Sequence, residues 1–379
     1  MERSRNLNGA LEVLATEQGR FDWHDFDHDE IQLLVLEGLG QKKFRAQQIY
    51  QWLYLHLAGE VDEMTNLSKD LRERMGRLSR ASALKLKGTF EASDGTTKMT
   101  FECDDGAIIE TVYIPADGRN TLCISSQVGC AMGCTFCYTA KMGLKRNLTT
   151  AEIVGQVVHA RRIFAEKNGH IGNIVFMGMG EPLHNVDNVI QAIHIFTDDR
   201  GLNFSRRKVT VSTSGLVPAI ARLGAETDIQ LAISLNATTD ETRSKIMPVN
   251  DRWNLETLMS ALREFPLTNR ERITFEYVLI KDLNDTLDDA QRIIELIDGI
   301  PAKVNLIPFN THPGTPFETP SERRIDAFRD YLLSKDVAVF RRKTRGDDEM
   351  AACGQLGKPG DKEPPHVRKR LAAFREAKA

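Results

Sequence analysis

Three cysteines lie close together in this 379-residue chain, at the spacing C-x3-C-x2-C. They are Cys130, Cys134 and Cys137, in the stretch CISSQVGCAMGCTFCYTA at 123–140. Thiolates bind both zinc and iron–sulfur clusters, but a structural zinc site has four protein ligands, and no fourth cysteine follows at motif spacing. A [4Fe–4S] cluster held by three cysteines has one iron left for an outside ligand. The methionine moiety of S-adenosylmethionine (SAM) could fill that position; a zinc loop is the alternative.

The overall composition indicates an ordinary globular protein, with 41% hydrophobic and 27% charged residues. No apolar run reaches the ~20 residues of a membrane span, and the first residues lack the apolar core of a signal peptide. We therefore expect a cytoplasmic protein without membrane contact, in which clustered cysteines bind metal or catalyse. The net charge of −3 argues against nucleic-acid binding through overall charge. Local basic patches remain, at 42–45, 205–208, 340–345 and 366–370.

The first 115 residues contain two patterns. Around 49–57, apolar residues recur at helical spacing, so we expect the first ~85 residues to be helical. From 84 to 115, apolar and polar residues alternate around Asp-Gly pairs at 94–95 and 105–106, which predicts hairpin strands.

From residue 121 onward, six short apolar runs alternate with helical segments. They are TLCIS, GNIVFM, KVTVST, IQLAIS, ITFEYVL and KVNLIP. This order predicts a parallel sheet with crossover helices, either doubly wound or a barrel. Thr149 and Glu152 form a capping-box pattern where the first of these helices begins. In both architectures the functional residues lie at the carboxyl ends of the strands, where the cysteine loop and the GMGEP stretch at 178–182 occur.

The cysteine loop resembles the signature of the radical SAM superfamily, because an aromatic residue, Phe136, precedes the last cysteine. The resemblance implies an α/β fold, a partial (β/α)6 barrel, with one [4Fe–4S] cluster bound by the three cysteines. Gly180 and Glu181 match the strand end that binds the amino group of SAM in that superfamily. A dinucleotide fingerprint is excluded there, since Leu183 occupies the place of its last glycine.

Further motifs resemble the RlmN/Cfr family of ribosomal RNA adenosine methyltransferases, over roughly residues 30–360. They are ETVYIP at 110–115, CISSQVGC at 123–130, GLKRNLT at 143–149, MGMGEPLHN at 177–185, STSG at 212–215, NLIPFN at 305–310 and RKTRGDD…AACGQL at 342–356. The segments GQKKFRAQQIYQWLY and DEMTNLSKDLRE resemble the accessory domain of the RlmN branch. The resemblance implies a helical accessory domain at 1–85, a β-hairpin extension at 86–120, the barrel at 121–345, and a C-terminal loop with a basic tail at 346–379.

The resemblance also implies a reaction. An adenine ring carbon between two nitrogens is electron-poor, so a radical route replaces simple displacement of a methyl group. Cys353 matches the cysteine that carries the methyl group as S-methylcysteine, and two SAM molecules are used per turnover. Cys123 matches the thiol that resolves a transient protein–RNA crosslink and forms a disulfide with Cys353. Glu110 matches the proton acceptor, a role that suits a carboxylate.

The remaining SAM-contact positions of the family match residues at strand ends of this chain. They are Ser212, Ser234, Leu235, Asn236 and Asn310. Asn236 stands where many members have histidine, and both side chains can form hydrogen bonds.

The partners implied are 23S rRNA, at an adenosine of the peptidyl-transferase region, and tRNA, at an adenosine beside the anticodon. An electron donor of the flavodoxin or ferredoxin type and a thiol reductant are also implied, and a monomer is expected. Candidate phosphate contacts are the KKFR patch at 42–45, Arg206, Arg207 and the 340–345 run. The alternatives are a Cfr-type enzyme that methylates carbon 8, a non-catalytic metal-containing RNA-binding protein, and a radical SAM enzyme for a small metabolite. The non-catalytic alternative would not need Cys123, Cys353 or Glu110.

Overall fold

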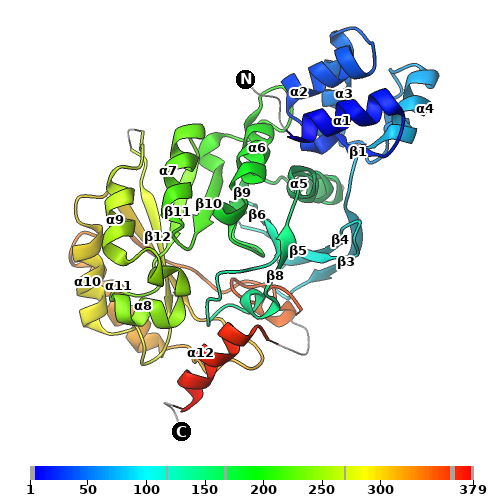
Figure 1. Cartoon of the computed structure of the whole chain (residues 1–379). Helices are drawn as coiled ribbons and strands as arrows, with labels where there is room; N and C mark the ends of the chain where they lie inside the picture. The colour runs from blue at the N-terminus through cyan, green and yellow to red at the C-terminus, as the bar shows by residue number, and fades with distance from the viewer. Residues whose placement is uncertain (1–4, 117, 166–168, 269, 359–362, 377–379) are drawn as a thin grey trace.

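The computed structural model describes residues 5–116, 118–165, 169–268, 270–358 and 363–376 (Figure 1). Its centre is a ten-stranded sheet in the order β14-β13-β12-β11-β10-β9-β6-β5-β4-β3. The parallel strands are β6 (Thr121–Cys123), β9 (Asn173–Phe176), β10 (Val209–Thr213), β11 (Gln230–Ser234), β12 (Ile273–Leu279), β13 (Ala302–Pro308) and β14 (Val339–Arg341). The first six are the six predicted runs. Because the parallel strands lie side by side in chain order, the sheet has no reversal point and is a partial barrel, not a doubly wound sheet.

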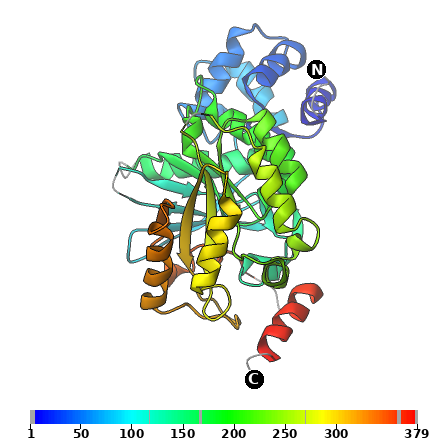
Figure 2. The same ribbon diagram turned by 90° about the vertical axis from the view of Figure 1, so that its left-hand side faces the viewer.

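Helices connect the parallel strands and cover the outside of the curved sheet (Figures 1 and 2). They are α5 (Thr150–Ala165), α6 (Val186–Thr197), α7 (Val217–Glu226), α8 (Asp240–Ile246), α9 (Leu255–Arg263), α10 (Leu287–Ile297) and α11 (Glu322–Leu333). The predicted capping box is present. The Glu152 N–H donates to Thr149 Oγ1 at 3.1 Å, and the Thr149 N–H donates to the Glu152 carboxylate at 3.0 Å.

Three antiparallel strands extend the same sheet beyond β6: β3 (Lys85–Glu91), β4 (Thr97–Glu102) and β5 (Ile108–Ile114). Both Asp-Gly turns are found, with φ of +81° at Gly95 and +77° at Gly106, a region that glycine adopts without strain. Because β5 pairs with β6, the extension is continuous with the barrel sheet.

Cys103 lies directly after β4, and burial raises the pKa of its thiol to about 12.

The N-terminal part is helical, with α1 (Arg5–Thr16), α2 (His28–Leu33), α3 (Phe44–Tyr54) and α4 (Lys69–Leu78). Two short strands, β1 (Phe21–Asp22) after α1 and β2 (Ser79–Arg80) after α4, pair in parallel. It packs on α5 and α6, as the blue ribbon of Figure 1 shows. Asp25 accepts a hydrogen bond from the Ala151 N–H at 2.8 Å, so the accessory part caps the first turn of α5.

The cysteine loop and the C-terminal segment lie at the opposite end of the molecule (Figure 1). The antiparallel strands β7 (Gln127–Gly129) and β8 (Leu144–Asn147) flank the loop. After β14 the chain leads to α12 (Pro365–Glu376), which contains the basic patch at 366–370. Residues 359–362 and 377–379 of the predicted tail lie outside the described residues. Within the described ranges, no helix is both long and apolar enough to span a membrane.

Candidate active site

A cavity opens at the carboxyl ends of the parallel strands, which is where ligands bind in parallel α/β sheets and barrels. Its wall brings together ten of the thirteen residues that the sequence predicts for the site. They are Cys130, Cys134, Cys137, Gly180, Glu181, Ser212, Ser234, Asn236, Asn310 and Cys353. The other three, Cys123, Glu110 and Leu235, do not line this cavity.

Backbone contacts fix the cysteine loop. The Cys130 N–H donates to the Gly143 carbonyl at 3.0 Å, and the Thr135 N–H donates to the Ile246 carbonyl at 3.0 Å. Gly129 has φ +78°, and a Cβ there would lie 1.8 Å from the Gly143 oxygen, so only glycine allows this close approach.

The three cysteines are half-buried, and desolvation raises the pKa of each thiol. Among the described side chains, no three of His, Cys, Asp or Glu form a group that could hold a metal ion. The thiols nevertheless line one cavity. In a [4Fe–4S] cluster each thiolate binds a different iron. The bound metal keeps its thiol ligands deprotonated, which would offset the effect of desolvation on their pKa values. The donor set therefore fits such a cluster.

Glu181 is a buried carboxylate held in a fixed orientation. Its two oxygens accept the N–H groups of Leu183 at 3.0 Å and Ser214 at 2.8 Å. Burial raises the pKa of Glu181, and these backbone hydrogen bonds act against that rise. Gly180 has φ +102°, and a Cβ there would meet the Gln127 side chain at 2.5 Å. The strand end thus presents a rigid acceptor to the cavity.

The polar residues of the neighbouring strands have partners of their own. Ser212 Oγ donates to Glu276 at 2.7 Å. The Asn236 amide donates to Met247 Sδ at 3.3 Å, and its oxygen accepts the Val278 N–H at 2.9 Å. Ser234 lines the cavity. The fully buried Leu235 does not, so its predicted contact with SAM would have to come from its backbone.

Cys123 and Cys353, 230 positions apart in the sequence, line one smaller neighbouring cavity, and both are free thiols. Asn310 holds the segment that carries Cys353, because its amide donates to the Cys353 carbonyl at 3.0 Å. Thr344 Oγ1 in turn donates to Asn310 at 2.9 Å. The structure thus brings the two thiols to one region without a disulfide.

Glu110 lies in β5 and is buried. Its carboxylate accepts the Gly357 N–H at 2.7 Å, and Lys98 Nζ lies 4.0 Å away. A hydrogen bond at 2.6 Å joins Ser125 Oγ to the Glu110 carbonyl, and Ser125 Oγ also accepts the Met179 N–H at 2.9 Å. Glu110 is therefore connected to the GMGEP strand end but is covered by the C-terminal segment.

Two charged residues of the cavity wall, Arg342 and Glu276, were not among the predicted site residues. Arg342 was assigned to the basic run at 340–345 as a candidate phosphate contact, but its guanidinium lies 3.5 Å from Glu276. Its neighbour Arg341 instead pairs with Glu322 at 2.6 Å. Successive side chains of an extended chain point to opposite sides. This alternation is the feature of the sequence that could have shown that Arg341 and Arg342 face different surroundings. Arg206 and Arg207 pair with Asp228 and Glu271, so their charges are partly matched within the protein.

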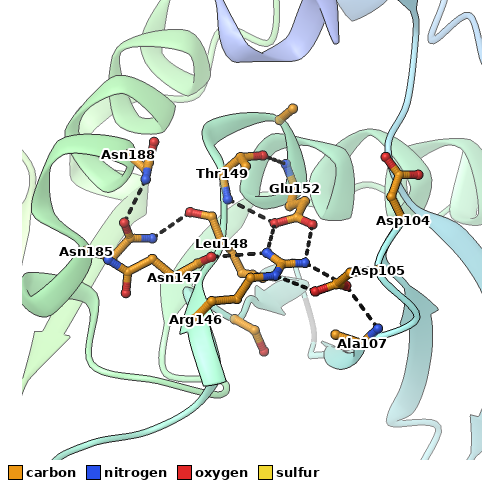
Figure 3. Close-up of polar contacts among 12 residues, drawn as sticks. Asp104, Asp105, Ala107, Arg146, Asn147, Leu148, Thr149, Glu152, Asn185 and Asn188 are labelled. Atoms are coloured by element: carbon orange, nitrogen blue, oxygen red, sulfur yellow. Dashed lines mark hydrogen bonds and ion pairs between the residues drawn. The ribbon is translucent and has the colours of Figure 1, made fainter. Parts of the chain in front are cut away.

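Arg146 of the GLKRNLT motif joins three elements near the site (Figure 3). Its guanidinium contacts Glu152 of α5 at 2.7 and 2.8 Å and Asp105 of the hairpin turn at 2.7 Å. Asn185 donates to the Leu148 carbonyl at 2.8 Å beside this network. The strand after the cysteine loop is thereby fastened to the barrel and to the β extension.

Comparisons with known proteins agree with this geometry. Residues 124–297 match the model of the radical SAM superfamily, and residues 22–80 match that of the ribosomal RNA large subunit methyltransferase N-terminal domain. A radical SAM methyltransferase from Sphaerobacter thermophilus has a similar crystal structure, with a TM-score of 0.86 and 41% identity, covering 89% of this chain and 99% of that one. The fold and the cysteine-lined cavity therefore define a radical SAM enzyme.

Two relatives are more similar in sequence, and each is called dual-specificity RNA methyltransferase RlmN. The protein from Pelobacter propionicus is 54% identical over 85% of this chain and 91% of its own. The protein from Geotalea uraniireducens is 52% identical over 89% of this chain and 96% of its own. The chain belongs to the RlmN family, and membership implies a [4Fe–4S] cluster and SAM. The Cfr alternative is not favoured.

Proposed function

We propose that the enzyme methylates carbon 2 of an adenosine in the peptidyl-transferase region of 23S rRNA, and of an adenosine beside the anticodon of some tRNAs. The names of the relatives support an RNA substrate. The observation that carries the proposal is that Cys353 lines the same cavity as Cys130, Cys134, Cys137 and Glu181. A methyl-carrying thiol has to lie within reach of both the cluster and the cofactor.

Each residue of the site has a part in this proposal. Bound cluster and SAM supply a reducing electron and a radical able to remove a hydrogen atom, with two SAM molecules used per turnover. Cys353 accepts a methyl group as S-methylcysteine. After this group has lost a hydrogen atom, its carbon bonds to the adenine carbon and gives an S–CH2–adenine crosslink, with one electron returned to the electron donor's side of the reaction and the ring proton taken by Glu110. Cys123 then attacks the sulfur of Cys353, which breaks the bond between that sulfur and the methylene carbon; this carbon takes up a proton and becomes the methyl group of the released RNA, and the disulfide is left for a thiol reductant.

The SAM-binding residues follow from the cavity wall. Glu181 offers a fixed carboxylate to an amino group, and Ser212, Ser234 and Asn310 offer hydroxyl and amide groups to a ribose or an adenine edge. Because Gly357 occupies the Glu110 carboxylate, the segment at 343–358 has to shift when an adenosine enters. An unstacked base entering a pocket is the usual way for enzymes to act on a nucleobase.

The test is the identity of the product. Anaerobically reconstituted enzyme is incubated with SAM, a reductant of the flavodoxin type, and unmodified 23S rRNA or tRNA, and nucleosides are separated against standards by mass spectrometry. We expect 2-methyladenosine from the wild type and none from Cys353→Ala with its cluster intact. 8-Methyladenosine, or a Cys353→Ala variant that is as active as the wild type, would overturn the proposal.

A further inference from the structure

The C-terminal helix α12 packs on the outside of the cysteine loop. Gly133 lies inside this loop, next to Cys134, and a Cβ on Gly133 would lie 3.1 Å from the imidazole ring of His366. Where the loop ends, a Cβ on Gly143 would lie 3.3 Å from Pro364, the residue that precedes the helix. The first turn of α12 is therefore in direct contact with the segment that carries the three thiols.

One face of α12 is held against the rest of the protein. Val367 and Leu371 are fully buried, and because they are four positions apart they lie on the same side of the helix. Beside them, the Arg370 guanidinium donates to Asp251 at 2.8 Å, which joins α12 to the turn after α8. The helix thus forms the surface of the molecule over the cysteine loop, at the end opposite the accessory part (Figures 1 and 2).

The other face of α12 carries exposed positive charge. Arg368 and Lys369 are exposed, and at about 100° per residue both point away from the buried side of the helix. Arg252, at the end of the turn that α12 contacts, is exposed as well. Within the described parts of the chain, none of the three forms an ion pair. These three residues, the α12 patch, concentrate positive charge on a chain whose net charge is −3.

We infer that the α12 patch is the docking site of an acidic electron-carrier protein of the flavodoxin type. The inference rests on the need of the proposed reaction for an electron donor. One electron leaves the reduced flavin of the carrier, which is oxidised, and enters the oxidised cluster of the cysteine loop, which is reduced; no bond forms or breaks. Electron transfer slows steeply with distance, so the carrier has to dock close to that loop. Complexes of this kind have small interfaces and are guided by opposite charges.

The position of the α12 patch favours a protein carrier over RNA, although both are anionic. Residues 22–80, which match the N-terminal domain of ribosomal RNA methyltransferases, lie at the opposite end of the molecule from α12 (Figure 1). A carrier that docks on α12 leaves that end free for RNA. The enzyme could therefore receive an electron while its substrate is bound.

The test measures reduction of the cluster by flavodoxin in the absence of RNA. Oxidised enzyme with its cluster is mixed anaerobically with fully reduced flavodoxin at low salt, and the change in flavin absorbance is followed by stopped flow. The double substitution Arg368→Glu and Lys369→Glu should lower the second-order rate about tenfold, because electrostatic steering is lost. The difference should disappear in about 1 M salt, where the Debye length is about 3 Å. Binding of oxidised flavodoxin, measured by calorimetry at low salt, should weaken as well.

Two controls separate docking from other effects of the substitutions. Photoreduced 5-deazariboflavin, a small uncharged reductant, should reduce the cluster of the variant at the wild-type rate. The double substitution Arg323→Glu and Lys335→Glu makes the same change in charge at exposed residues in and directly after α11, and should leave reduction by flavodoxin unchanged. Equal slowing by both double variants, or no slowing by the first, would refute the docking site.

Two further outcomes also decide the question. If charge reversal on α12 lowers the cluster content, Arg368→Gln with Lys369→Gln replaces it; slowing of about threefold supports the inference, and an unchanged rate refutes it. If the α12 variants lose affinity for tRNA but keep the wild-type rate with flavodoxin, the patch contacts RNA and the inference is wrong. Neither the reduction rate nor flavodoxin binding depends on which adenine carbon is methylated, so failure here leaves the proposed function standing.

Discussion

Glu181 and Cys123 are both buried, but their surroundings suit them to different chemistry. Backbone N–H groups reach both oxygens of Glu181, which supports a carboxylate in the cavity wall. Cys123 is 5% exposed, and burial raises the pKa of its thiol. A thiol that burial keeps protonated is a poor nucleophile, which suits the late role proposed for Cys123.

At this scale we predict that Cys123→Ala traps the enzyme on its RNA. The adduct between Cys353 and adenine then has no thiol to release it, so turnover stops after about one cycle. The measurement is a denaturing gel, on which a slowly migrating protein band should appear with RNA and disappear after nuclease treatment. Cys103→Ala, a change at another buried cysteine outside the cavity, is the matched control and should turn over normally. Normal turnover by Cys123→Ala would contradict the resolving role.

The residues of the site were predictable only as far as local motifs reach. The three cysteines could be found because their spacing and strand-end position encode the chemistry, whereas Gly180 and Glu181 were predicted from the resemblance to the radical SAM superfamily. The proximity of Cys123 and Cys353 could not be derived from spacing, since it depends on how the segment after β14 folds back over Asn310. Glu276 was missed because a charged residue within the apolar run ITFEYVL gives no sign of which wall it faces.

At the scale of elements, two polar networks fasten the parts that surround the barrel. Arg146 connects β8 to the start of α5 and to the hairpin turn, and Asp25 connects the accessory part to the first turn of α5. Both converge on the same helix end. The position of α5 therefore depends on charged and polar side chains as well as on its apolar face.

We predict that Arg146→Met lowers the free energy of unfolding by about 2 kcal/mol, less than for a fully buried pair because the side chain is partly exposed. Glu152, 6% exposed, would lose its cationic partner. Denaturant unfolding followed by circular dichroism measures the change. Arg329→Met is the control, since its partners Asp326 and Asp330 are exposed, and its effect should be below about 0.5 kcal/mol. Equal effects of the two substitutions would contradict a structural role for the network.

Burial and the charge of Asp22 raise the pKa of Asp25 to about 7. An unfolded aspartate ionises near 3.8, so between these values the folded protein keeps a proton that the unfolded chain has lost. This group therefore makes folding less favourable as pH rises toward 7. The loss amounts to about 2 kcal/mol between pH 5.5 and 7.

Asp25→Asn keeps an oxygen that can accept the Ala151 N–H but cannot ionise. The difference in unfolding free energy between pH 5.5 and 7.5, measured for both proteins with denaturant, should be more favourable for the variant by about 2 kcal/mol. The comparison cancels other groups that titrate in this range. An identical pH dependence in both proteins would show that Asp25 is already ionised in the folded state.

The elements themselves followed from the sequence where pattern and length were sufficient. The six apolar runs and the capping box at Thr149 and Glu152 are present as predicted. The strand β14 was missed, because its three residues VFR carry no apolar alternation and its Phe340 is exposed. Its place at the sheet edge is decided by pairing with β13, which is a tertiary interaction.

At the scale of the whole molecule, the accessory part has an exposed basic patch at the start of α3. Lys42, Lys43 and Phe44 are exposed at the start of α3, and Arg45 lies 4.9 Å from the centre of the Phe44 ring. Among the described residues, neither lysine has an ion-pair partner, unlike Arg206 and Arg207. An exposed aromatic ring among cations suits base stacking and phosphate contact.

We predict that the double substitution Lys42→Gln and Lys43→Gln weakens RNA binding at low salt. It should reduce the slope of log affinity against log salt concentration by about 1 to 2, since two phosphate contacts are lost. Fluorescence anisotropy with tRNA over a salt series measures both values. The control removes two lysines that already have acidic partners, Lys69 and Lys245, and should leave the slope unchanged. If the substitutions at Lys42 and Lys43 left the slope unchanged, these two lysines would not contact phosphate.

In the proposed reaction the methyl group passes through Cys353, and a pulse and chase with labelled SAM can follow it. Enzyme whose Cys353 is loaded from deuterated SAM is washed, then given unlabelled SAM, reductant and RNA for a single turnover. We predict that deuterium leaves the Cys353 peptide and appears in the 2-methyladenosine of the first turnover. A first turnover in which the new methyl group carries no deuterium, while Cys353 keeps its label, would contradict it.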